Sequence, residues 1–109
     1  MRQSHTAVIE RDVEWHGLAT TEPYECGWAS EAIFFVRTLD SHGDLRSVGL
    51  RVQISPDGMH WCDEGTSLVL TSSDVDHCRV RHFGNWLRLR AQLPEGVSIR
   101  VLVALALKE

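Results

Sequence analysis

The sequence predicts an all-β fold, an antiparallel β-sandwich or jelly roll of about seven or eight strands. Short runs of β-branched and aromatic residues recur along the chain, and clusters of Pro, Gly and Asp separate them. No stretch carries the apolar period of about 3.6 residues that marks an amphipathic helix. The length, 109 residues, suits one domain with one core. We therefore assign residues 1–109 to a single sandwich domain, in which residues 1–15 form an edge strand or an N-terminal arm.

The clearest strand and turn lie in residues 50–61, LRVQISPDGMHW. Apolar and polar residues alternate from 50 to 55, which indicates a strand with one buried face. Pro56 presets the first turn position, Asp57 can accept hydrogen bonds from the following backbone, and Gly58 can adopt the left-handed conformation. We expect a tight hairpin, with Trp61 on the return strand folded back over its partner.

The first half of the chain reads as strands separated by long polar loops. Residues 5–15 have acidic side chains at alternate positions, which predicts a strand with one acidic face. Residues 17–27 collect Thr, Glu, Pro and Gly and predict a loop with a short extended piece near Tyr24. The β-formers of residues 31–39 predict a buried strand, and residues 40–47 predict a polar loop that turns at a glycine.

The second half alternates short strands with polar connections. Strands are predicted at residues 67–71, 78–83, 86–93 and 97–107. Connections are predicted at residues 63–66, 72–76 and 94–96. The strands on either side of Gly84 are expected to pair as a hairpin. The last strand is apolar at most positions of both faces, so we expect it to be either centrally buried or in contact with another subunit.

Three segments in this order, VQISPDGMHW, HFGNWLRLRAQL and VSIRVLVALAL, carry a resemblance to known families. The series resembles the second half of discoidin-like domains, the C-type domains of coagulation factors, with their Asp-Gly turn, their Arg-Leu strand and their closing strand. It is also similar to small β-sandwich proteins encoded among phage and prophage structural genes. The first resemblance implies a sandwich that binds carbohydrate or lipid, and the second implies a sandwich with a structural role in a particle.

Charge and cysteine content narrow the classes of partner and compartment. The net charge of −4 argues against broad binding to nucleic acid or to an anionic membrane. The three cysteines are an odd number without CxxC spacing, which favours a reducing compartment over a secreted disulfide framework. No signal peptide or stretch long enough to span a bilayer is recognisable. We expect a cytoplasmic protein at synthesis, open to later incorporation into a particle.

Arginines and carboxylates supply the main candidates for an interface. Six arginines alternate with apolar neighbours in the predicted strands: Arg51, Arg79, Arg81, Arg88, Arg90 and Arg100. Three acidic residues alternate in the first strand: Glu10, Asp12 and Glu14. One interpretation is a solvated basic face. Another matches the arginines with these carboxylates, within one subunit or from the N-terminal arm of a neighbour, because guanidinium groups bind carboxylates with good geometry.

Four tryptophans are candidates for stacking on a ligand. Trp61 and Trp86 lie in hairpin contexts, where we expect packing in the core. Trp15 and Trp28 flank the first predicted loop, so we expect them to be accessible and to form the ligand surface, if the chain has one. Sugars are the class of ligand that this choice suggests.

Motifs for metal binding and catalysis are weak. His60 and Cys62 would share one face of a strand, but they lack the tight paired spacing of a structural zinc site. Asp57, Asp63 and Glu64 offer oxygen ligands for calcium, although Asp57 already has a role in the turn. Ser, His and Asp are present without a G-x-S-x-G elbow or a comparable context. We expect no metal, no cofactor and no enzymatic activity.

Together these observations predict a non-enzymatic structural or assembly module. We expect a subunit repeated in a larger complex, such as a phage-like particle, a decoration layer or a tail structure, whose partners are other copies or other proteins. The alternative is a discoidin-like module that binds carbohydrate or another small ligand.

Overall fold

The computed structural model describes residues 2–71 and 73–109. Within these residues the chain forms nine strands and one short 3-10 turn, η1 (Leu45–Ser47). The strands are β1 (Ser4–His16), β2 (Leu18–Thr20), β3 (Tyr24–Glu25), β4 (Glu31–His42), β5 (Gly49–Ser55), β6 (Cys62–Val69), β7 (Val75–Arg81), β8 (Trp86–Gln92) and β9 (Ser98–Lys108). In this part of the chain no helix has the length and apolar character needed to cross a bilayer.

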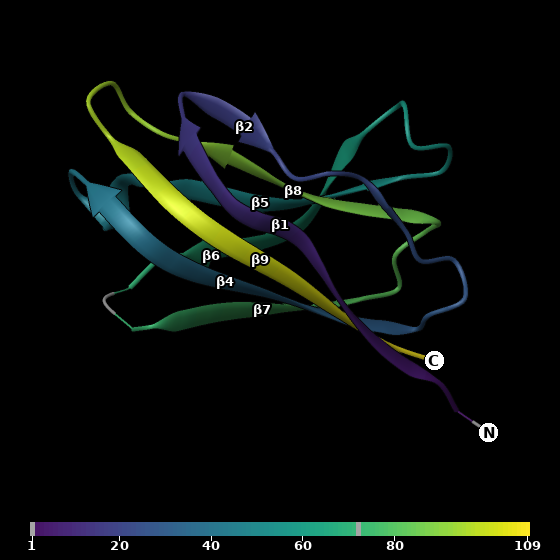
Figure 1. Ribbon diagram of the computed structural model, residues 1–109. Helices are drawn as coiled ribbons and strands as arrows, with labels where there is room; N and C mark the ends of the chain where they lie inside the picture. Colours follow the sequence, from purple (N-terminus) through teal and green to yellow (C-terminus); the bar gives the residue numbers. More distant parts are fainter. Residues whose placement is uncertain (1, 72) are drawn as a thin grey trace.

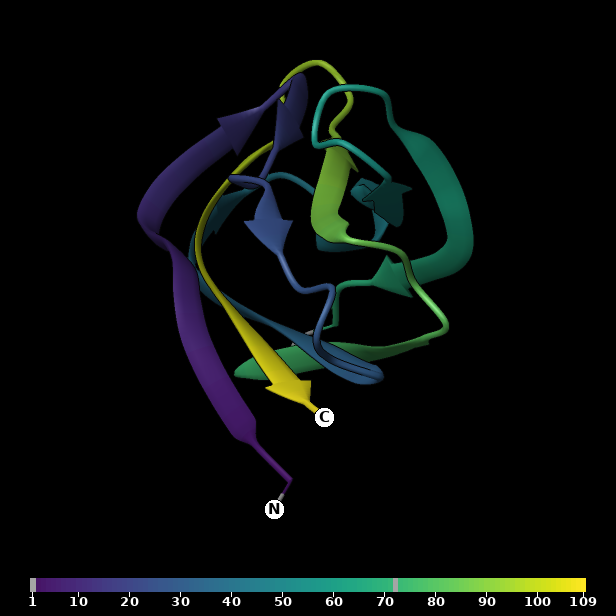
Figure 2. The ribbon, with the colours of Figure 1, turned by 90° about the vertical axis from the view of Figure 1, so that its right-hand side faces the viewer.

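The strands form two antiparallel sheets (Figure 1). Sheet A has the order β1-β9-β4-β7, and sheet B has the order β2-β8-β5-β6 with β3 also paired to β8. The pairs are nested, since β5 pairs with β6, β4 with β7, β2 and β3 with β8, and β1 with β9. A long hairpin wound around itself produces this order, which is that of a jelly roll. Figure 2 shows the strands curving around a common interior, with both termini at one end.

The core lies between the sheets and follows the period of two in the strands. In sheet A, β9 places every second residue from Ile99 to Leu107 inward, and β4 adds Phe34 and Val36. Sheet B contributes the inward side chains of β5 and β8, among them Val52 and Leu89, which are 0% exposed. Burial of these apolar side chains, worth about 1.5–3 kcal/mol each, is the main force that holds the sheets together.

The predicted fold class is confirmed, and most strands lie where the sequence places them. The last strand is central in sheet A, between β1 and β4, and its inward residues from Ile99 to Leu107 are buried in the core. The acidic first strand lies at the edge of sheet A and pairs with β9 of the same chain. Gly43 turns the chain after β4 with a positive φ of 96°. The short extended piece near Tyr24 is β3.

Four details of the predicted strands are wrong. The predicted connection at residues 72–76 includes Val75 and Asp76 of β7, and its residue 72 lies outside the described residues. Strands β7 and β8 do not form a hairpin around Gly84, because β7 pairs with β4 in sheet A whereas β8 lies in sheet B. Residues 63–66 are no connection but part of β6, which bulges against β5 at Gly65, where φ is 116°. Strand β2 lies inside the predicted loop of residues 17–27, because pairing with β8 overrides its weak local signal.

Candidate interaction surfaces

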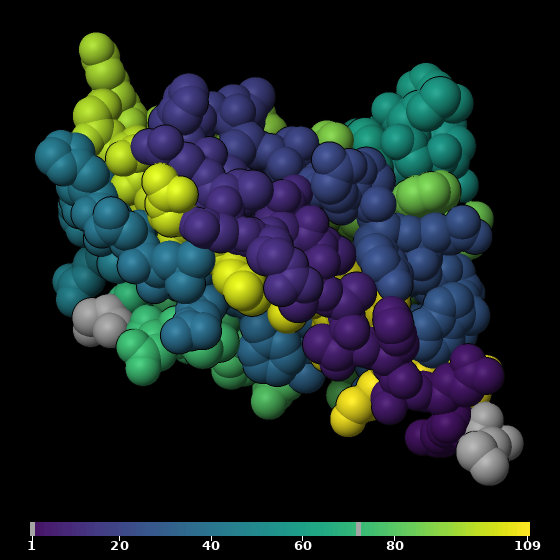
Figure 3. Space-filling model, in the orientation of Figure 1, coloured from purple at the N-terminus to yellow at the C-terminus, as the bar shows by residue number. Residues whose placement is uncertain are grey.

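The outer surface of sheet A, here called face A, is the surface turned toward the viewer in Figures 1 and 3. It carries the outward side chains of β1, β9, β4 and β7, and the strand register arranges them in rows across the sheet. One row is Val8, Ala104, Phe35 and His77, and the next is Thr6, Ala106, Ile33 and Arg79. Outward positions thus form a continuous surface, and no other strand of the described residues lies above it.

The centre of face A is apolar. Its apolar residues are Val8, Ile33, Phe35, Leu102, Ala104 and Ala106, and Val75 lies apart at the β7 edge, beyond Arg37. Val8 is 42% and Val75 46% exposed, and the other five are half-buried by their neighbours in the sheet. Atoms of β9 are visible between β1 and β4 in Figure 3. Single exposed apolar residues are normal on a monomer, but a contiguous cluster of this kind is typical of a contact surface.

Charged side chains of both signs surround this apolar centre. At one end, Lys108 lies opposite Glu31 across the β9 and β4 pair, and Glu31 lies opposite Arg81 of β7. At the other end, Arg100 lies opposite Asp40 of β4 and opposite Glu14 of β1. An apolar centre with a charged rim is the usual arrangement of a protein–protein interface.

The three acidic residues of β1 that are interface candidates have different local roles. Asp12 accepts a hydrogen bond of 3.3 Å from the Arg100 guanidinium, an ion pair within one subunit. Asp12 occupies a bulge in β1 and has a φ of 81°, a left-handed conformation that Asp adopts more readily than most residues. Glu10 accepts a hydrogen bond of 2.8 Å from the Glu22 backbone N–H and so fastens the loop after β2. Glu14 lies across from Arg100.

The six arginines that are interface candidates do not form one stripe, because the strands that carry them belong to different sheets. Arg79, Arg81 and Arg100 lie on face A. The other three, Arg51, Arg88 and Arg90, lie on the outer surface of sheet B, here called face B, where Arg51 and Arg90 are direct cross-strand neighbours. Strand parity was visible in the sequence, but the assignment of β7 and β8 to opposite sheets was not.

A chain of polar contacts crosses face B. Arg88 Nε donates to Gln53 Oε1 at 2.8 Å, and Gln53 Nε2 donates to Asp63 Oδ1 at 3.0 Å. Arg51 donates to the other oxygen of Asp63 at 3.1 Å. The Arg88 guanidinium lies 4.2 Å from the centre of the Trp61 ring, a cation–π contact. Burial, with the nearby charge of Arg90, lowers the pKa of Arg88, and the hydrogen bond from Gln53, with help from Arg51, lowers the pKa of Asp63.

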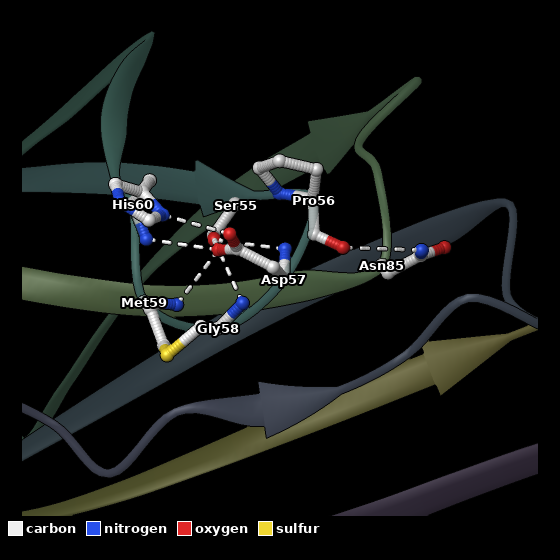
Figure 4. A network of polar contacts seen from close by, with 7 residues as sticks. All are labelled: Ser55, Pro56, Asp57, Gly58, Met59, His60 and Asn85. Carbon is white, nitrogen blue, oxygen red and sulfur yellow. Dashed lines mark hydrogen bonds and ion pairs between the residues drawn. The ribbon is translucent and has the colours of Figure 1, made fainter.

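The connection between β5 and β6 borders face B and confirms the predicted turn roles of Asp57 and Gly58 (Figure 4). It is longer than the expected tight hairpin, because it spans residues 56–61 and Trp61 precedes the return strand β6. The Ser55 hydroxyl accepts hydrogen bonds from the backbone N–H groups of Asp57 and Gly58, at 3.2 and 2.8 Å. The Asp57 carboxylate accepts from the backbone of Met59 and His60 and lies 2.7 Å from the His60 ring nitrogen. These bonds hold the pKa of Asp57 well below its usual range. Gly58 has a φ of 79° and lies against the Trp86 ring.

The tryptophans are distributed differently from the prediction. Trp15 is 3% exposed and belongs to the core, because it lies in register with the inward Ile99 of β9; the expectation that it is accessible is wrong. Trp28 is 42% exposed, as a ligand platform requires. Trp61 and Trp86 are half-buried outside the core, so the expected core packing of these two is also wrong. Of the four rings, Trp28, Trp61 and Trp86 therefore have surface that a ligand can reach.

Among the described residues, no three His, Cys, Asp or Glu side chains are placed to hold a metal ion. His60 is engaged by Asp57, and Cys62 is exposed at the start of β6. Cys78 is buried, and burial raises the pKa of its thiol to about 11. The weak zinc candidates His60 and Cys62 therefore belong to no such group.

Sequence reasoning did not assign Ile33 and Phe35 to a surface. A signal was present, since residues 32–36 are apolar at both parities and so cannot all point into one core.

Neither a protein-family model nor a curated protein matches the chain in sequence.

Proposed function

We propose that this chain is a non-enzymatic structural module, a subunit repeated in a larger protein assembly, and that it contacts its neighbours through face A. The apolar centre of face A carries the proposal. Ile33, Phe35 and Leu102 would stay in contact with water in an isolated subunit, and removing that apolar area from water favours association by about 25 cal/mol per Å². The charged rim gives such a contact orientation.

The strand order also fits an assembly role, by analogy with other jelly rolls. Jelly rolls serve as the subunits of viral capsids, and a phage-like particle, a decoration layer or a tail structure is a setting of the kind proposed. Jelly rolls also occur in lectins and in cupin enzymes, so the fold supports the proposal by analogy only. Support for the assembly role therefore comes from the surface of sheet A and not from its topology.

The test is the mass in solution, measured by light scattering coupled to size separation over a range of protein and salt concentrations. We expect the wild type to exceed the monomer mass as its concentration rises. Phe35→Glu, which places a charge in the apolar centre, should restore the monomer at every concentration. Val69→Glu is the matched control, because Val69 is 60% exposed on β6, in the other sheet, and its substitution should leave the mass unchanged.

Two outcomes contradict the proposal. One is a wild type that stays monomeric at the highest concentration reached, and the other is association that survives Phe35→Glu but is lost in Val69→Glu. Circular dichroism of each variant shows whether the sandwich is still folded. Salt sensitivity would locate part of the interaction in the charged rim.

A second candidate function is the binding of a carbohydrate or another small ligand, and face B favours it. Trp61 lies beside the hydrogen-bonding groups of Arg88, Gln53 and Asp63, a combination of aromatic surface and fixed polar groups that is typical of small-ligand sites. Trp28 is the second accessible ring. Tryptophan fluorescence titrated with a panel of glycans tests this function. A response that is lost in Trp61→Ala or Trp28→Ala supports it, and no response to any glycan contradicts it.

A further inference from the structure

We propose that face A binds a second copy of this chain, around a two-fold axis that runs parallel to the strands along the boundary between β4 and β9. The inference rests on the proposed function and adds to it the partner, the symmetry and the residue pairs. Its evidence is the strand register of sheet A together with the size and charge of the outward side chains.

The register between β4 and β9 defines five outward cross-strand pairs. They are Lys108 with Glu31, Ala106 with Ile33, Ala104 with Phe35, Leu102 with Arg37, and Arg100 with Asp40. In the two apolar rows, β9 contributes only alanine and β4 contributes a large side chain. Face A is therefore low over β9 and raised over β4, and a shallow hollow lined by Ile33, Ala106, Glu31 and Lys108 lies at this step.

A two-fold axis along the β4 and β9 boundary lays β9 of one copy over β4 of the other, row by row. Phe35 of each copy then meets Ala104 of the second copy, and Ile33 meets Ala106. Large side chains enter the low parts of the facing surface at both places, which is the size complementarity that close packing between two sheets requires. The match is reciprocal, because each copy supplies both the large and the small member.

The same two-fold rotation also places oppositely charged side chains of face A opposite each other. Lys108 meets Glu31 of the second copy at one end of the interface, and Arg100 meets Asp40 of the second copy at the other. The same rotation lays β1 over β7, so that Thr6 faces Arg79, a hydroxyl that can accept from a guanidinium. No row of the dimer sets like charges directly opposite one another.

The other simple arrangement, a two-fold axis that runs across the strands, gives the opposite result. It reverses the rows, so that Lys108 faces Arg100 and Glu31 faces Asp40 of the second copy. Like charges directly opposite each other destabilise a contact. In the middle row Phe35 would also face Phe35 of the second copy, and Ala104 would face Ala104, so that large meets large and small meets small. Size and charge therefore select the same axis.

The area of face A gives the size of the expected interface. Four strands spaced ~4.8 Å apart, over eight steps of ~3.3 Å from Arg100 to Lys108, cover roughly 500 Å² per copy. The dimer would bury about 1,000 Å² in total, the lower limit of a specific interface. We expect a reversible dimer with a dissociation constant on the order of micromolar.

The experiment is pairwise cross-linking in a Cys62→Ser background, which removes the exposed native thiol. One variant carries Thr6→Cys and the other Arg79→Cys, both at exposed positions. In the proposed dimer these residues face each other across two sheets ~10 Å apart, whereas Thr6 lies ~17 Å from Thr6 of the second copy because β1 and β7 are three strand spacings apart. A bis-maleimide with a span of ~10 Å distinguishes the two separations.

We expect the mixture of the two variants to form a cross-linked dimer at least tenfold faster than either variant alone. Adding Phe35→Glu to both should abolish this difference and serves as the control for random collision. A dimeric mass without preferential cross-linking in the mixture, or with preferential cross-linking of Thr6→Cys to itself, overturns the two-fold arrangement and leaves the proposed function intact. A monomeric mass overturns both.

Discussion

Replacement of Gly58 by alanine tests how the turn between β5 and β6 packs on sheet B. Gly58 has a φ of 79°, and a Cβ atom built on it would lie 3.1 Å and 3.2 Å from two ring atoms of Trp86. Gly96 is the matched position, because its φ is 83° and a Cβ atom there meets nothing within 4 Å. The two glycines thus share the left-handed backbone and differ in crowding.

The expected losses follow from these two terms. Holding alanine in the left-handed conformation costs about 1–2 kcal/mol, so Gly96→Ala should lower the free energy of unfolding by that amount. Crowding against a ring that is part of the sheet adds about 1 kcal/mol or more, so Gly58→Ala should cost about 2–3 kcal/mol. On a domain of this size the extra kilocalorie corresponds to roughly 4 °C in Tm.

Urea unfolding followed by far-UV circular dichroism measures both variants without relying on tryptophan emission. A Trp86→Leu background completes the comparison, because removal of the indole ring should reduce the cost of Gly58→Ala to that of Gly96→Ala. Equal costs for the two alanine variants in the wild-type background, or an unchanged difference after Trp86→Leu, would refute the crowding argument.

Three further predictions concern stability and thiol chemistry. The Thr38 hydroxyl is buried without a hydrogen-bond partner among the described residues, so Thr38→Val should raise the free energy of unfolding by about 1 kcal/mol in a urea titration, and a loss of stability would contradict this. Burial raises the pKa of the Cys26 thiol to about 12, so a thiol reagent near pH 8 should label Cys62 alone in the native protein, and rapid labelling of a second thiol would show that the interior is accessible. The pKa of Asp57 is lowered by its backbone hydrogen bonds, so its carboxylate stabilises the fold above its unfolded pKa of about 3.9 and loses this effect as the pH falls through the lower folded value. As the pH is lowered below about 4, the Tm of Asp57→Ala should therefore fall less than the Tm of the wild type. Curves of Tm against pH that run parallel for the two proteins would argue against this role.

The candidate surfaces were only partly visible in the sequence. The outward apolar side chains of β9 follow from a strand that is apolar at both parities, and the same pattern in residues 32–36 points to Ile33 and Phe35. Parity also places each arginine opposite apolar neighbours. Parity does not say which sheet a strand joins, so the division of the arginines between the two faces, and the burial of Trp15, depended on pairings between distant segments.

The local sequence by itself determined where the strands lie and how the turn after β5 is built. Alternating side chains define the strands, and the Ser55, Asp57 and Gly58 turn closes on its own hydrogen bonds within a few residues. Strand order, register and the composition of each outer face were decided only by the tertiary structure. The reason is physical: a β-strand satisfies its backbone hydrogen bonds with a distant partner, and the choice among partners depends on the packing of the whole core. The nested pairing of β1 with β9 and of β4 with both β7 and β9 therefore assembles face A, a surface that no single segment of the chain contains.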